Sequence, residues 1–125
     1  MAATSPQKIA QVAIAVRDLE RAKAFYRDVL GLAWIADAPP GLSFFQCGEV
    51  RLMLSQPEGP ETAGNSILYY SVDDARAAHD ELVAKGVTFE AAPHVVGKLG
   101  DSEVSLAVCR DSEGNLLGLM SETRS

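Results

Sequence analysis

Apolar and polar residues follow one another along this chain in two kinds of pattern, and the order of the patterns repeats. A short run rich in β-branched residues, 9–16, is followed by Asp18 and then by apolar residues at helical spacing up to Gly31. The run predicts a strand, and the spacing behind an aspartate cap predicts a helix over about Leu19–Leu30. Three further apolar runs, separated by turn residues, predict strands at 32–35, 42–47 and 50–55.

The second half of the chain starts the same order again. Residues 57–65 (PEGPETAGN) have the composition of a solvated linker. A strand is predicted behind them at 66–72, then a helix that Asp73 or Asp74 caps and Gly86 closes, and then strands near 88–91, 104–109 and 116–120. Because the V-x-D of 16–18 recurs at 72–74, we predict two βαβββ modules, 8–56 and 66–121, that pair to bury their sheets.

The composition narrows the class of protein. No apolar run approaches the roughly 20 residues of a membrane span, and the start of the chain shows no secretory pattern, so we expect a cytoplasmic protein. A net charge of −6 argues against nucleic-acid partners, because such binding depends on lysine and arginine side chains that neutralise phosphates. The two cysteines, Cys47 and Cys109, lie far apart in apolar runs and are predicted to be buried free thiols.

Three stretches resemble one known family. They are V-x-D-L-x-x-A-x-x-F-Y-x-x-V-L-G at 16–31, S-V-D at 71–73 and D-S-E-G-N at 111–115. Because these stretches occur in this order within a repeated pattern, the chain resembles the vicinal oxygen chelate proteins over about residues 8–121. These proteins form the glyoxalase, bleomycin-resistance and dioxygenase family. The resemblance implies an α+β fold of two βαβββ modules that form a half-closed barrel of eight strands. It also implies a homodimer and a divalent metal in the cavity.

The residues at the implied metal positions do not suit a metal ion. The resemblance places these positions at Gln11, Met53 (or Leu52 if the register is shifted by one), Ile67 and Gly118. A divalent ion takes most of its binding energy from carboxylate, imidazole or thiolate donors, and isoleucine and glycine supply no side-chain donor. We therefore expect neither a metal nor another cofactor.

The strand positions that the resemblance places on the cavity wall instead predict a mostly apolar surface that binds a small molecule. Its ligand-binding residues would be Gln11, Arg51, Met53, Ile67, Tyr69, Gly118 and Met120. A concave apolar wall with few polar groups is typical of small-molecule sites. The alternative is that these side chains fill the space themselves. Trp34, Phe44 and Phe45 are interpreted as core aromatics.

Two further residues are candidates for acid–base chemistry. His94 follows Pro93 in a predicted loop, and Glu103 precedes a predicted strand with its direction undetermined. Three functions stay open at this stage. The chain is a metal-free protein that binds an apolar or aromatic small molecule, a metal-independent isomerase, epimerase or lyase, or a dimeric scaffold whose cavity is filled.

Overall fold

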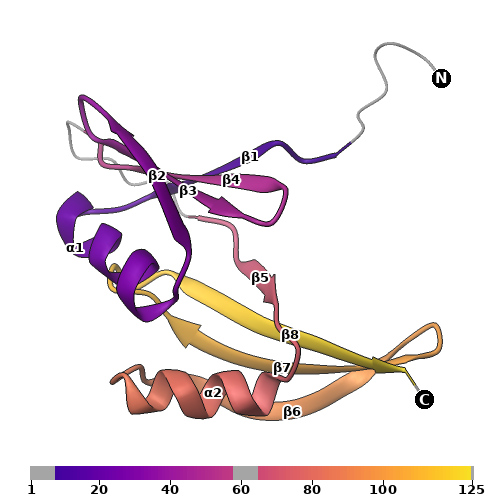
Figure 1. Cartoon of the computed structure of the whole chain (residues 1–125). Coiled ribbons are helices and arrows are strands. Elements are labelled where there is room, and N and C mark those ends of the chain that lie inside the picture. Colours follow the sequence, from indigo (N-terminus) through magenta and orange to yellow (C-terminus); the bar gives the residue numbers. More distant parts are fainter. Residues whose placement is uncertain (1–7, 58–64, 125) are drawn as a thin grey trace, which may run out of the picture. The chain divides into compact units, whose positions relative to one another are not determined.

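The computed structural model describes residues 8–57 and 65–124 (Figure 1). The described residues divide into two compact units, the first ending at Asn65 and the second beginning at Ser66. The predicted linker at 57–65 lies mostly outside the described residues. No helix in the described part is long and apolar enough to cross a membrane. The first unit contains β1 (Gln11–Ala15), α1 (Leu19–Ala24), η1 (Phe25–Val29), β2 (Ala33–Ala38), β3 (Leu42–Cys47) and β4 (Val50–Ser55). The second contains β5 (Leu68–Ser71), α2 (Ala75–Ala84), β6 (Phe89–Leu99), β7 (Ser102–Arg110) and β8 (Leu116–Arg124).

Both units have the same topology. The sheets have the strand orders β1-β4-β3-β2 and β5-β8-β7-β6. In each sheet the first strand pairs in parallel with the last, and the other neighbours pair antiparallel. In each unit the helix and the two strands that follow it connect the parallel pair, since parallel strands need a long crossover connection. The predicted α+β fold of two βαβββ modules is confirmed.

The helix of the first unit begins as predicted but does not stay regular. Asp18 caps it by accepting a hydrogen bond from the Arg21 backbone N–H at 3.1 Å. From Phe25 the turn widens into the π-helical segment η1, in which the Leu30 N–H donates to the Phe25 carbonyl at 2.9 Å. Phe25 and Tyr26 are consecutive and both buried, and their rings meet edge to face at 5.3 Å. The prediction of one regular α-helix was therefore wrong for its last turn.

The core of the first unit lies between α1 and the strands β3 and β4. Phe45 and Leu54 are fully buried, and the Phe45 ring centroid lies 6.4 Å from that of Tyr26. Trp34 was predicted in this core, and that prediction was wrong, because the residue is 46% exposed. It lies on β2, an edge strand, which has only one neighbouring strand in the sheet.

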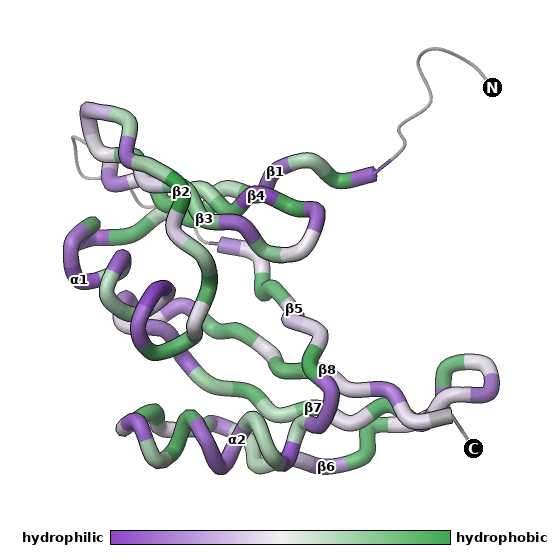
Figure 2. The backbone as a smooth tube through the Cα atoms, in the orientation of Figure 1, coloured by the Kyte–Doolittle hydropathy of each residue, from purple (hydrophilic) through white to green (hydrophobic). Residues whose placement is uncertain are grey.

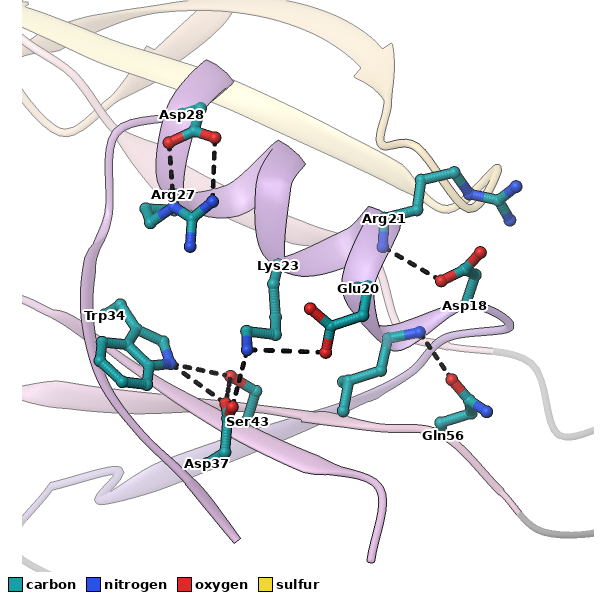
Figure 3. Close-up of polar contacts among 11 residues, drawn as sticks. Asp18, Glu20, Arg21, Lys23, Arg27, Asp28, Trp34, Asp37, Ser43 and Gln56 are labelled. Atoms are coloured by element: carbon teal, nitrogen blue, oxygen red, sulfur yellow. Dashed lines mark hydrogen bonds and ion pairs between the residues drawn. The ribbon is translucent and has the colours of Figure 1, made fainter. Parts of the chain in front are cut away.

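A polar cluster joins α1 to the edge of the first sheet (Figure 3). Lys23 Nζ lies 2.7 Å from one carboxylate oxygen of Asp37 and 5.6 Å from the centre of the Trp34 ring. The other oxygen of Asp37 accepts hydrogen bonds from the Ser43 hydroxyl at 2.7 Å and from Trp34 Nε1 at 3.2 Å. These contacts, the one to Lys23 first and that to Ser43 second, hold the pKa of Asp37 below its ordinary value of 3.8.

Replacing Asp37 with asparagine should remove a pH-dependent part of the stability. A lowered pKa in the folded state stabilises the fold above the unfolded pKa, and this contribution disappears as the pH falls through the folded pKa. We expect Asp37→Asn to reduce the free energy of unfolding by about 1 kcal/mol at pH 7, because solvent screens a side chain that is 40% exposed. The difference should shrink from pH 5 towards pH 3 in urea titrations. A difference that stays constant with pH, or an equal effect of Glu81→Gln at an exposed helix position, would contradict this.

The second unit packs α2 against β6, β7 and β8 (Figure 1). Asp74, rather than Asp73, caps this helix, because its side chain accepts from the N–H groups of Arg76 and Ala77. Figure 2 shows apolar positions on the helix and on the strands that it covers. The side chains buried in this layer are Ala75, Leu82, Ala107, Cys109, Leu117 and Leu119.

The β6–β7 hairpin is longer than the sequence predicted. β6 pairs with β7 from the Phe89–Cys109 pair to the Leu99–Ser102 pair, with register shifts in between. His94 therefore lies within β6, and its placement in a loop was wrong. Pro93 does not end the strand because β6 is an edge strand, where proline is tolerated although it has no N–H to donate.

Candidate functional site

One face of the first sheet brings three of the predicted ligand-binding residues together. β1 and β4 pair in parallel, so that Gln11 lies opposite Arg51 and Ala13 opposite Met53. The Gln11 amide oxygen accepts a hydrogen bond from Arg51 Nε at 2.6 Å. Its amide nitrogen donates to the Met53 sulfur at 3.7 Å. Gln11, Arg51 and Met53 are thus in direct contact, with the Gln11 side chain in the centre.

The strand register supports Met53 rather than Leu52 as the second implied metal position. Ala13 pairs with Met53, and Tyr69, which follows Ala13 by the repeat offset of 56, pairs with Gly118. Met53 is therefore the counterpart of Gly118. Leu52 points the other way and is only 2% exposed, as a core residue of the first unit.

A hollow of about 320 Å³ lies over this face, and Gln11, Ile35, Phe44 and Arg51 line it. The Arg51 guanidinium carbon lies 5.9 Å from the centroid of the Phe44 ring. Ile35 was not predicted in the site. The interpretation of Phe44 as a core aromatic was wrong, because its half-buried side chain lines this hollow. A register shift between Trp34 and Ala36 interrupts the alternation of side chains between the two faces of β2. The residue pattern does not predict this shift.

The corresponding face of the second unit carries Tyr69, Gly118 and Met120. Tyr69 pairs with Gly118, and Leu106 pairs with Met120. A Cβ atom added at Gly118 would lie 2.5 Å from Cδ1 of Tyr69, so the Tyr69 ring already occupies the space where a side chain at position 118 would begin. Ile67 precedes β5 and is 42% exposed.

Comparison with known proteins agrees with this architecture. A sequence model of the Glyoxalase/Bleomycin resistance protein/Dioxygenase superfamily matches residues 8–119. The chain belongs to this superfamily. Among curated proteins, no significant sequence match was found.

Several solved structures have the same fold. A lactoylglutathione lyase from Agrobacterium tumefaciens is 27% identical, with a TM-score of 0.72, and the match covers 93% of this chain and 94% of that one. UcmS2 is also 27% identical, with a TM-score of 0.74 and coverage of 93% and 98%. A glyoxalase/bleomycin resistance protein/dioxygenase from Alicyclobacillus acidocaldarius, 18% identical with a TM-score of 0.71 and coverage of 94% and 93%, shows likeness of fold alone.

The divalent metal implied by the resemblance does not fit the residues present. Of the four implied positions, Gln11 offers an amide oxygen and Met53 a thioether, whereas Ile67 and Gly118 offer no side-chain donor. The amide oxygen of Gln11 already accepts from Arg51, whose positive charge would repel a cation at this point. Within residues 8–57 and 65–124, no group of three or more histidine, cysteine, aspartate or glutamate side chains is arranged to hold a metal ion.

His94 and Glu103, the two candidates for acid–base chemistry, do not lie in one site. His94 lines a separate hollow of about 290 Å³ beside the first turn of α2, together with residues such as Asp73, Ser105 and Ser121. Its Nδ1 atom lies 2.7 Å from the Ala92 carbonyl oxygen, which fits an Nδ1–H donor and leaves Nε2 as the basic nitrogen. Glu103 is exposed on β7 opposite Lys98, and it does not line this hollow.

The free thiols are poor nucleophiles. Cys109 is fully buried as predicted, whereas Cys47 is only half-buried. Burial, with a smaller effect of the Asp111 charge, raises the pKa of the Cys109 thiol to about 11. Burial also raises the pKa of Cys47. Because the thiolate is the reactive form, neither residue is suited to nucleophilic catalysis near neutral pH.

Proposed function

We propose that this superfamily member binds a small, partly apolar organic molecule without using a metal ion. The observation that carries the proposal is the contact of Gln11 with Arg51 in the hollow beside Phe44. It puts a fixed cation at the first implied metal position and combines two polar side chains with an aromatic wall. A mainly apolar lining with a few placed polar groups is the usual composition of a small-molecule site.

The second unit supports the metal-free part of this proposal. A carboxylate ligand at position 118 would need the space that the Tyr69 ring fills. Tyr69 itself is 52% exposed, so part of its side chain is accessible to a ligand. A metal-independent isomerase or lyase has less support, because His94 and Glu103 do not line one hollow. The homodimer stays a prediction.

A thermal shift experiment on the full chain tests the proposal. We expect EDTA, or added nickel, zinc or manganese, to leave the melting temperature unchanged, because the described residues offer no metal site for the folded state. In a panel of aromatic acids, amides and amines, at least one class should raise the melting temperature by several degrees when its concentration far exceeds its dissociation constant.

Two results would count against the proposed function. A fall of several degrees with EDTA that one particular metal reverses would show a metal site and refute the metal-free reading. A panel in which no organic class changes the melting temperature would favour the scaffold alternative instead. Mass spectrometry of any ligand after long incubation with the protein would show whether it is only bound or is also converted.

A further inference from the structure

We infer that the ligand is an aromatic carboxylate, and that Arg51 binds its carboxylate group while Phe44 and Ile35 contact its ring. This inference rests on the proposed function and specifies the class of ligand for the same hollow. It follows from the state of the Arg51 guanidinium, from the charges around it and from the apolar walls beside it.

The Arg51 guanidinium uses only one of its hydrogen-bond donors among the described residues. Arginine has five N–H donors in one plane, and the bond from Nε to the Gln11 oxygen, 2.6 Å long, uses one of them. The remaining four are on the two terminal nitrogens. Two parallel N–H groups at that end match the two oxygens of a carboxylate. Gln11 thus fixes the orientation of the group and leaves its carboxylate-binding end available.

Arg51 differs from three other cations of the described first unit in having no carboxylate partner there. In the described part of the first unit, Lys8, Lys23 and Arg27 each pair with a carboxylate, at 3.4, 2.7 and 2.9 Å. Arg51 has no such partner among residues 8–57 and 65. In a chain with 17 acidic and 11 basic residues, an arginine that lines a hollow without an acidic neighbour is available to an external anion.

The walls of the hollow beside Arg51 are suited to the apolar part of a ligand. The Phe44 ring lies beside the guanidinium, with 5.9 Å from its centroid to Arg51 Cζ, and Ile35 lies on the wall of the same hollow and is 45% exposed. A flat ring attached to the carboxylate would pack against Phe44 and Ile35 while its oxygens face Arg51. The volume of about 320 Å³ is near the lower end of ligand pockets, which favours a molecule with a single ring system.

The test compares two probes that differ in charge and little in shape, trans-cinnamate and cinnamamide. Their affinities for the full chain are measured by calorimetry or ligand-observed NMR at low and high salt. We expect cinnamate to bind about tenfold more tightly than cinnamamide, and added salt should weaken only the acid. Arg51→Met should abolish this preference, because it should weaken the binding of cinnamate far more than that of cinnamamide. Arg51→Lys, which keeps the charge but lacks the two parallel donors, should lose most of it.

Arg110→Met is the matched control, because that arginine pairs with Glu90 and the Gly114 carbonyl oxygen in the second unit and should not affect the preference. Circular dichroism melts check that each variant is folded. Equal binding of acid and amide by the natural chain would overturn the carboxylate inference and leave the proposed function standing. If neither probe binds, the inference is also wrong, and the thermal shift panel then decides whether the proposed function fails with it.

Discussion

Replacing Phe45 with alanine should lower the free energy of unfolding by about 3–5 kcal/mol, the largest loss that we expect from a single substitution of this chain. The Phe45 side chain is fully buried and packs near Tyr26, and its strand neighbours are Leu52 and Trp34. Removing the ring leaves a cavity in a close-packed layer that cannot fully collapse. Urea unfolding followed by the fluorescence of Trp34, the single tryptophan of the chain, measures the loss in this unit.

Phe44→Ala is the matched control for this prediction. Phe44 is the preceding residue on the same strand, but it is half-buried and lines the hollow on the other face of the sheet. Its truncation removes less buried surface and opens no enclosed cavity, so we expect less than half of the loss. Equal losses at the two positions would show that the core of the first unit is not where the structure places it.

Adding a single methyl group at Gly118 should destabilise the second unit by about 1–3 kcal/mol, the cost typical of overpacking. The new Cβ would lie 2.5 Å from Cδ1 and 2.9 Å from Cε1 of Tyr69, so the ring must leave its place. A second contact, 3.1 Å from a terminal methyl of Leu106, requires only a small shift. Urea unfolding followed by circular dichroism measures the change.

A double-mutant cycle separates this steric effect from other causes. In a Tyr69→Ala background, Gly118→Ala should be neutral or stabilising, since alanine restricts the unfolded chain more than glycine does. If Gly118→Ala costs the same with and without the tyrosine ring, the ring does not occupy the space at position 118. Gly118→Glu would place a carboxylate at the implied metal position. For the same steric reason, we expect this variant to be stable only when Tyr69 is also replaced by a smaller residue.

Local patterns account for the parts of the fold that the sequence predicted well. Asp18 and Asp74 cap helices because each places a carboxylate next to the N–H groups of the following turn, and that contact needs no distant residue. The strands at 42–47 and 50–55 were predicted to the residue, because the turn at Gly48 and the apolar runs on both sides of it are local signals.

The candidate functional site depends on contacts between residues that are far apart in the sequence, and local patterns do not predict such contacts. The Gln11–Arg51 hydrogen bond joins residues 40 positions apart, and the register of a parallel strand pair brings them together. Ile35 lines the hollow at a register shift in β2, which the sequence pattern does not show. Trp34 is half-exposed because its strand is at a sheet edge. Arg51 was predicted as a site residue, but its place between Gln11 and Phe44 could not be read from residue spacing.

The sequence by itself therefore determined the repeat, the α+β class and the poor set of metal donors, since these depend on residue type, short-range spacing and hydrophobic periodicity. The tertiary structure decided which of those residues meet. It extended β6 through Pro93 because pairing with β7 outweighs the local preference for a turn, and it placed His94 in a different hollow from Gln11. It also laid the Tyr69 ring over Gly118, a contact set by strand pairing that residue identity alone does not predict.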